Sequence, residues 1–436
     1  MQRHPECARA LAQAIRKARK GIHRMATSHI SMPASPGGSA IRYHGFDALR
    51  ASMMMLGVYL HAVCAYATMD HIWWYKDAQT SVAWDLQCLF IHVFRLPMFF
   101  VMCGFFAALL AGKRGLPGFW RNRMLRIGLP LVLFGVLLVA FLRPMEYLGR
   151  EFGRNPDALR RVWIYVSHFR FLTPITTMHL WFLVVLMCLY PLAPILQWAL
   201  AGRFGVSVDS VFGRLVASPG APLAMGVVTF LTLLPMHSGI LDTPDGIPAP
   251  RILTAYAVFF TFGWLLFRRR DVLGVFAGRA WNYLAWALVF AAADLAFVKW
   301  QLDIRPVSSR LAILGTAASG ALFCWLMIFA LMGLFLRYAN QANERVRWIS
   351  DSAYWIYLVH PVALLGVQVV LRDLQVAPSV KLLLTLAPSI GILFASYEWM
   401  VRGRWLGWLL NGTPRTATRA ANPPHAVRAP AVPQEA

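Results

Sequence analysis

Charged side chains are scarce in this sequence of 436 residues, where Asp, Glu, Lys and Arg together make up only 14%. Hydrophobic residues make up 58%, and the mean hydropathy is +0.54. Soluble globular domains carry about 25% charged residues, so this composition excludes an ordinary soluble protein. We therefore expect an integral membrane protein.

Acidic residues are the scarcer of the charged types, with 19 Asp and Glu against 42 Lys and Arg, which gives a net charge of +23. Nucleic-acid binding is one interpretation of such an excess of positive charge. The basic residues lie mainly in short stretches between apolar segments, however, rather than in one domain. We expect no nucleic-acid partner, and the charge must be explained with respect to a membrane.

Cysteine motifs, a leader and repeats are also missing. The six cysteines form no CxxC pair and five of them fall within apolar segments, so neither a disulfide framework nor a metal site is predicted. The first forty residues hold no apolar run long enough for the core of a signal peptide, and we expect no cleavage. We find no internal repeat.

Apolar segments of about 20 residues recur along the chain, and this is roughly the length that crosses a hydrocarbon core about 30 Å thick. The sequence therefore predicts an all-α fold, a polytopic transmembrane helical bundle of about ten spanning helices. Their predicted ranges are 46–69, 84–111, 122–142, 179–200, 220–236, 251–267, 280–299, 310–336, 351–371 and 379–401.

The distribution of Lys and Arg predicts the orientation of this bundle. With the N-terminus inside, cytosolic segments hold 27 of these residues and external segments hold 13. This asymmetry predicts that both termini are cytosolic. Residues 1–42 form a basic cytosolic tail, either a helix lying on anionic lipid or a disordered segment. Residues 43–410 form the transmembrane domain, and residues 411–436, rich in Pro, Ala and Thr, form a disordered cytosolic tail.

Ionisable groups within the first two predicted helices are candidate functional residues, because such groups are costly inside a membrane. Arg50 and His61 are eleven residues apart, so they share one helix face, and His61 lies roughly 16 Å further from the cytosol. Gly57 on the same stripe would let a ligand or a neighbouring helix approach closely. The second helix runs in the opposite direction and brings His92 and Arg95 to a similar depth. The alternative is that these groups only bond neighbouring helices, with Arg95 paired to an acid such as Asp85 or Asp294.

A basic cluster follows the second helix on the cytosolic side. Guanidinium groups bind phosphates in bidentate fashion, so the cluster could hold a nucleotide-bearing donor. The alternative is ordinary anchoring by positive charge at the inner membrane surface. Its candidate donor-binding residues are Arg121, Arg123 and Arg126.

Several segments resemble motifs of the membrane acyltransferase-3 family. The run 46–51 with His61 resembles the opening motif, 97–105 the second-helix motif, and 121–130 the basic loop, while 179–183 and 354–361 resemble two later motifs. Within the family, the segment 90–95 is most similar to the periplasmic glucan succinyltransferases. One departure is Cys103, where the family usually has serine. This thiol could be a covalent acyl carrier, but a buried thiol is usually an inert hydrophobe.

The resemblance implies an enzyme of the bacterial inner membrane that moves an acyl group from cytosolic acyl-CoA to hydroxyls of a periplasmic glucan. Succinyl-CoA is the favoured donor and acetyl-CoA the alternative; membrane lipid is a further partner, a homo-oligomer is an open question, and no metal is expected. His61 would be the general base, a role suited to a group that ionises near neutral pH. The full set of implied residues is His61, Arg50 and Asp47 for catalysis, Arg121, Arg123, Arg126 and Arg95 for the donor, and His179, Trp181, His92 and His360 for the acceptor.

Three alternatives stay open at this point. His179 and Trp181 could belong to an interfacial aromatic belt, and His360 could simply pack. The enzyme could be an O-acetyltransferase of another cell-surface polysaccharide. A glycan or lipid transporter without acyl transfer would use the same buried cations as a substrate path, although inverted repeats that would favour it are not seen.

Overall fold

The computed structural model describes residues 43–69, 72–151, 156–170, 177–244, 246–304, 307 and 309–412. Every regular element within these ranges is helical, which confirms the predicted all-α fold. The predicted tail 1–42 lies outside the described residues, as does 413–436 of the second tail. The main helices are α2 (His44–Val63), α3 (Val82–Arg123), α4 (Leu129–Glu151), α5 (Ala158–Ser167), α6 (Trp181–Leu189), α7 (Leu192–Ala199), α8 (Gly202–Ala217), α9 (Ala221–Leu233), α10 (Pro250–Arg268), α11 (Leu273–Asp303), α12 (Arg310–Tyr338), α13 (Glu344–Val370), α14 (Pro378–Ser396) and α15 (Trp405–Asn411).

Eight helical stretches in the described part of the chain are long and apolar enough to cross a membrane, fewer than the ten predicted. The first difference is that α3 and α4 form one stretch of 68 residues, Val82–Gly149, bent at Gly115, whose φ is +65°. At about 1.5 Å per residue this stretch measures roughly 100 Å, several times the thickness of a hydrocarbon core. The second difference is that α9 qualifies only together with α8, from which it is bent by 111°, and this pair would be the ninth.

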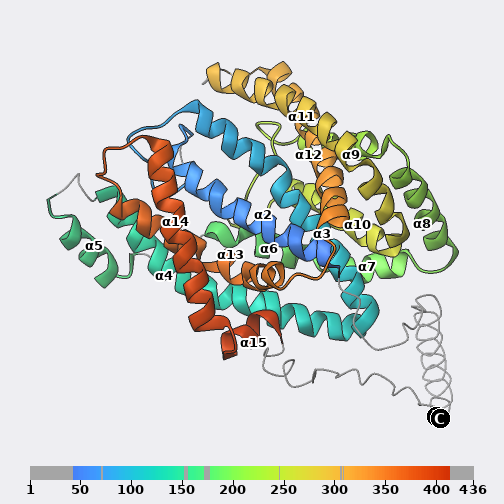
Figure 1. Ribbon diagram of the computed structural model, residues 1–436, viewed down its shortest axis with the longest axis horizontal. Coiled ribbons are helices and arrows are strands. Elements are labelled where there is room, and N and C mark those ends of the chain that lie inside the picture. The colour runs from blue at the N-terminus through green and yellow to red at the C-terminus, as the bar shows by residue number, and fades with distance from the viewer. Residues whose placement is uncertain are drawn as a thin grey trace, which may run out of the picture.

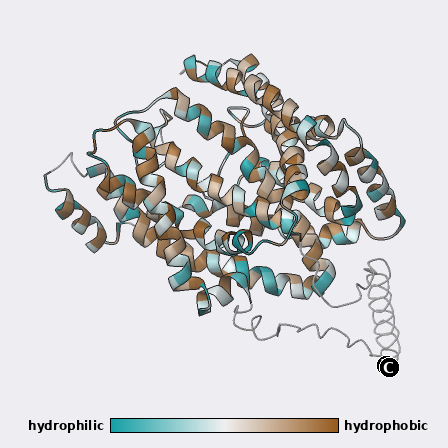
Figure 2. Ribbon diagram, in the orientation of Figure 1, coloured by the Kyte–Doolittle hydropathy of each residue, from teal (hydrophilic) through white to brown (hydrophobic). Residues whose placement is uncertain are grey.

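The outward faces of the bundle are hydrophobic, as expected for a surface in contact with lipid. Figure 2 shows hydrophobic ribbon on the outer helices as well as in the centre. On α4, for example, Val132, Val136 and Phe141 are 66%, 65% and 60% exposed. Such a continuous apolar surface is rare on soluble monomers, so it supports placement in a bilayer.

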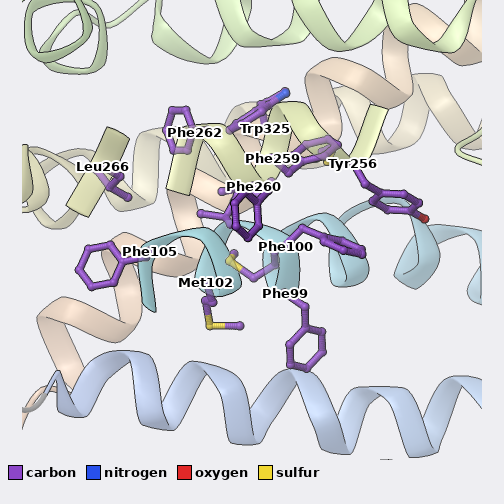
Figure 3. Packing of buried hydrophobic residues seen from close by; sticks show 14 of the residues in the cluster. Phe99, Phe100, Met102, Phe105, Tyr256, Phe259, Phe260, Phe262, Leu266 and Trp325 are labelled. Carbon is purple, nitrogen blue, oxygen red and sulfur yellow. The ribbon is translucent and has the colours of Figure 1, made fainter. Parts of the chain in front are cut away.

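The centre of the bundle is a tight crossing of α3 and α10, shown in Figure 3 with the phenylalanines of both helices interleaved. Two glycines make the close approach possible. A Cβ added at Gly104 would lie 1.9 Å from the carbonyl oxygen of Phe260, and one added at Gly263 would lie 1.9 Å from that of Val101. Small residues of this kind let helix backbones touch within membranes.

The helix α2 runs through the middle of the bundle and is flanked by α3, α12 and α13 (Figure 1). Its last turn continues into the segment 64–81, which leads to α3. Buried Asp77 in this segment accepts a 2.7 Å hydrogen bond from Lys381 of α14, while its backbone N–H donates to the carbonyl of Ala65. The segment is thereby fixed over the end of α2 that carries His61.

Candidate active site

A cavity of about 1360 Å³ opens at this end of the bundle. Its walls come from α2, α3, α4, α6, α11 and α13, and its rim from the segments that follow α2, α5, α9 and α13. The sequence places all of these connecting segments on the external side. The structure brings together in the wall six of the predicted site residues: His61, His92, Arg95, His179, Trp181 and His360.

His61 lies between two aromatic rings in this wall. The Trp73 ring stacks on it at 5.1 Å between centroids and 26° between planes, and the His360 ring lies 5.1 Å away on α13. Trp73 is held in turn, because its indole N–H donates a 2.7 Å hydrogen bond to Oε1 of buried Gln368. The imidazole of His61 thus has a fixed place, while its buried Nδ1 has no hydrogen-bond partner.

Two further histidines extend the cluster, and their hydrogen bonds show which ring nitrogens carry a proton. His360 Nδ1 lies 2.8 Å from the carbonyl oxygen of Tyr357, and His179 Nε2 lies 3.0 Å from that of Leu358. A carbonyl oxygen can only accept, so these nitrogens carry the protons. The other nitrogens, His360 Nε2 and His179 Nδ1, are buried without a partner and are lone-pair acceptors when the rings are neutral. The ring centroids of these two histidines are 5.4 Å apart.

Arg95 lies directly over Gly57, the position on α2 where the sequence predicted a close approach by a ligand or a neighbouring helix. A Cβ added at residue 57 would lie 1.7 Å from Arg95 Nη1, so a larger residue there would displace the guanidinium from this position. The Arg95 side chain makes no hydrogen bond or ion pair with any described residue, and its Nε is buried without a partner. Arg95 is therefore a cation that faces the cavity without a counter-ion among the described residues.

The alternative pairing of Arg95 with an acid of the protein is wrong for both candidates. Asp85 accepts hydrogen bonds from the backbone N–H groups of Thr68 and Met69 and from the Thr68 hydroxyl. Asp294 accepts from the hydroxyl of Ser319 on α12. Neither carboxylate is within ion-pair distance of Arg95. His92, the other candidate of α3, has Nε2 at 3.0 Å from the carbonyl oxygen of Leu241 on the cavity rim. Because a carbonyl oxygen only accepts, Nε2 is the donor.

Arg50 and Asp47 lie at the opposite end of α2 and do not line this cavity. Arg50 Nη2 donates a 2.6 Å hydrogen bond to the Ser350 hydroxyl and lies 3.5 Å from Asp47 Oδ1. Its side chain is 39% exposed. Asp47 thus lies next to Arg50, and at about 1.5 Å per residue the two are about 21 Å and 16 Å along the helix from His61.

The basic cluster at the C-terminal end of α3 is at the Arg50 end of the bundle and also stays outside the cavity. Arg126 donates to the carbonyl oxygens of Trp408 and Leu409 at the end of α15. Arg123 lies over the ring of Tyr190 at 5.1 Å, and Arg121 is exposed. Arg126 therefore fixes the last helix, and a role of the three arginines in donor binding stays a prediction.

Trp73 and Trp74 are site residues that the sequence reasoning missed. Trp74 lines the cavity, 4.7 Å from the ring of Trp73 and 6.4 Å from that of His179. Five rings thereby form a closed circuit around the cavity wall, in the order Trp73, His61, His360, His179 and Trp74. The signal available in the sequence was a pair of adjacent tryptophans in a segment predicted to be external.

No group of three or more His, Cys, Asp or Glu side chains in the described part of the chain is arranged to hold a metal ion. The residues at hand are instead suited to proton transfer and anion binding: a histidine with a free nitrogen, an unpaired arginine, and aromatic faces in a cavity large enough for a sugar.

A multi-pass helical bundle with this cavity belongs to a known class. Residues 43–409 match the model of the acyltransferase domain family Acyl_transf_3, so the chain belongs to that family. Among its relatives is glucans biosynthesis protein C of Salmonella paratyphi B, 26% identical over 408 residues that cover 88% of this chain and 98% of the relative. The protein of that name from Salmonella paratyphi A is 26% identical over 405 residues with the same coverage. No solved structure matches the chain.

Proposed function

We propose that this acyltransferase lies in the bacterial inner membrane. It transfers a succinyl group from cytosolic succinyl-CoA to a hydroxyl of a periplasmic glucan. The observation that carries the proposal is His61, whose ring is held in a cavity wall with Nδ1 unpartnered and an unpaired arginine nearby. The names of the relatives support a glucan as the acceptor.

The chemistry is a single acyl transfer. His61 takes the proton of the acceptor hydroxyl while that oxygen attacks the thioester carbonyl. The bond between carbon and sulfur breaks, an ester forms, and the thiolate leaves to be protonated. His360 and His179 offer further unprotonated nitrogens beside His61, which would accept a proton passed on from it.

The donor reaches His61 from the opposite end of α2. Arg50 and the exposed Arg121 are candidates to bind the phosphates of coenzyme A, because guanidinium groups bind phosphate in bidentate fashion. The distance from Arg50 to His61, about 16 Å along α2, is comparable with the extended thioester arm of the donor. The cavity at the other end would admit the glucan.

Arg95 is the reason for preferring succinyl over acetyl. A half-buried cation without a counter-ion among the described residues is costly, so an anionic group of the substrate is the natural partner for its guanidinium. The free carboxylate of a succinyl group fits two parallel N–H donors, and an acetyl group offers nothing in its place.

Transfer by purified protein in proteoliposomes tests the function. Labelled succinyl-CoA or acetyl-CoA is supplied on one side and glucan on the other, and label in the glucan is measured. We expect succinyl transfer by the wild type and a loss of at least about 10²-fold in His61→Gln, since general base catalysis contributes about 10² to 10⁴. The variant should keep its folding temperature. Near-normal turnover by His61→Gln would exclude His61 as the base, while glucan movement without ester formation would identify a transporter.

A further inference from the structure

Two cysteines from different helical segments are in contact in the cavity wall. Cys64 follows the end of α2, Cys88 lies in the second turn of α3, and their sulfur atoms are 3.3 Å apart. Both side chains are 4% exposed and both line the cavity. Among the described cysteines, this is the only pair whose sulfur atoms are in contact. The sequence, with no CxxC spacing, gave no sign of this pair.

The pair lies where a disulfide would join the end of α2 to α3. It closes the segment 65–87, which carries Trp73, the residue stacked on His61. The cavity that both thiols line opens at the end of the bundle that the proposed topology places in the periplasm, where disulfides form and persist. A disulfide sulfur separation is about 2.05 Å, so the two sulfurs need to approach by little more than 1 Å.

We propose that Cys64 and Cys88 form a disulfide in the mature protein. The thiolate of one cysteine attacks the disulfide of a periplasmic thiol oxidant and forms a mixed disulfide. The second cysteine then attacks that bond and releases the oxidant as a dithiol. The two protein thiols lose two electrons and two protons, and the oxidant disulfide gains them.

The cross-link ties the end of α2 to α3 beside the catalytic histidine. It restricts the separation of these helix ends in the unfolded chain and therefore raises the stability of the folded protein. It also fixes the segment that holds Trp73 against His61. Cys103, Cys188 and Cys324 touch no sulfur of another described cysteine, and we expect them to remain thiols.

Differential alkylation of the full-length protein tests this directly. Cells with an oxidising periplasm are lysed into SDS with N-ethylmaleimide, the protein is purified, reduced and labelled with an isotopically heavy maleimide, and peptides are analysed by mass spectrometry. We expect the first label on Cys103, Cys188 and Cys324 and the heavy label on Cys64 and Cys88. Cells grown with dithiothreitol should give the first label on all five. Full first labelling of Cys64 and Cys88 in untreated cells would overturn the proposal.

Thermal unfolding provides a second test that does not depend on acyl transfer. Reduction should lower the unfolding temperature of the wild type by several degrees and leave that of the double variant Cys64→Ser/Cys88→Ser unchanged. Cys324→Ser is the matched control, because it removes another buried thiol and should keep the response to reductant. Equal responses in the wild type and the double variant would count against the disulfide. If the double variant fails to fold, the labelling of the wild type alone decides whether the disulfide forms.

Discussion

Arg95 is the residue whose surroundings indicate most about the charge of the transferred acyl group. It lies over Gly57, makes no ion pair with a described residue and faces the cavity that contains His61. A residue kept in this state destabilises the empty protein, because desolvation of a charge is not offset. Under the proposed function, the carboxylate of a bound succinyl group would offset this cost, and the enzyme would prefer anionic acyl groups.

We predict that Arg95→Gln loses succinyl transfer far more than any acetyl transfer. Leaving one partner of a buried pair alone costs about 3–5 kcal/mol, which corresponds to a loss on the order of 10² to 10⁴ in kcat/KM for succinyl-CoA. Steady-state rates with both donors measure this. Arg50→Gln is the matched control, since weaker binding of coenzyme A phosphates should lower both rates by the same factor. Equal losses for both donors in Arg95→Gln would contradict carboxylate recognition.

Trp74 is predicted to bind the acceptor rather than the donor. Its ring lines the cavity between Trp73 and His179, where a sugar face could stack on it. Trp74→Ala should raise the KM for the glucan about tenfold, or about 1.4 kcal/mol, and leave the KM for the donor within twofold. Trp198, which is 80% exposed and lies outside the cavity, gives the control Trp198→Ala, expected to change neither constant. A changed donor KM with an unchanged glucan KM would remove Trp74 from the acceptor site.

At the scale of the helix, the periodicity of α2 predicted that Gly57 and His61 share a face, and both line the cavity, whereas Arg50 of the same stripe does not. Three turns of helix place Arg50, Gly57 and His61 on one face, and the structure keeps that face against α3 and α13. Helix positions followed from hydropathy in the same way. The continuous helical stretch of α3 and α4 could not be predicted from hydropathy, because the basic segment that joins them interrupts the apolar runs.

Contacts between distant segments were beyond the reach of the sequence. The stacking of Trp73 on His61 depends on Gln368, almost 300 residues later, and the touching of Cys64 and Cys88 depends on the crossing of two helices. Hydropathy and helical period describe each element alone. Only the packed bundle determines which side chains of different elements meet.

The crossing of α3 and α10 should be the most sensitive contact between helices. Gly104→Ala would bring a methyl group to 1.9 Å from the carbonyl of Phe260, so the two helices must separate. We expect a destabilisation of about 1–3 kcal/mol, typical of overpacked cores, seen as a lower unfolding temperature in detergent. Gly135→Ala on α4 is the control, because a Cβ there meets nothing within 4 Å. Similar unfolding temperatures for both variants would mean that the crossing tolerates a wider spacing.

At the scale of the whole molecule, the polar groups separate into two ends of one bundle. The cavity with its histidines and Arg95 lies at one end, and Arg50, Asp47 and the basic cluster lie at the other. An enzyme that joins a cytosolic donor to an external acceptor needs this separation. The bilayer would then keep the two substrates apart except along α2.

The orientation of the bundle in the membrane is the last prediction, motivated by the excess of Lys and Arg in the segments assigned to the cytosol. Asp157→Cys beside α5 and Gln341→Cys between α12 and α13 are exposed probe positions at opposite ends of the predicted topology. In a background where Cys7 and Cys188 are serine, a membrane-impermeant maleimide should label residue 157 in intact spheroplasts and residue 341 only after the membrane is opened. The Cys7, Cys188 background without probes gives the blank. Labelling in the reverse order would invert the protein, place the cavity in the cytosol and end the proposal of an external acceptor.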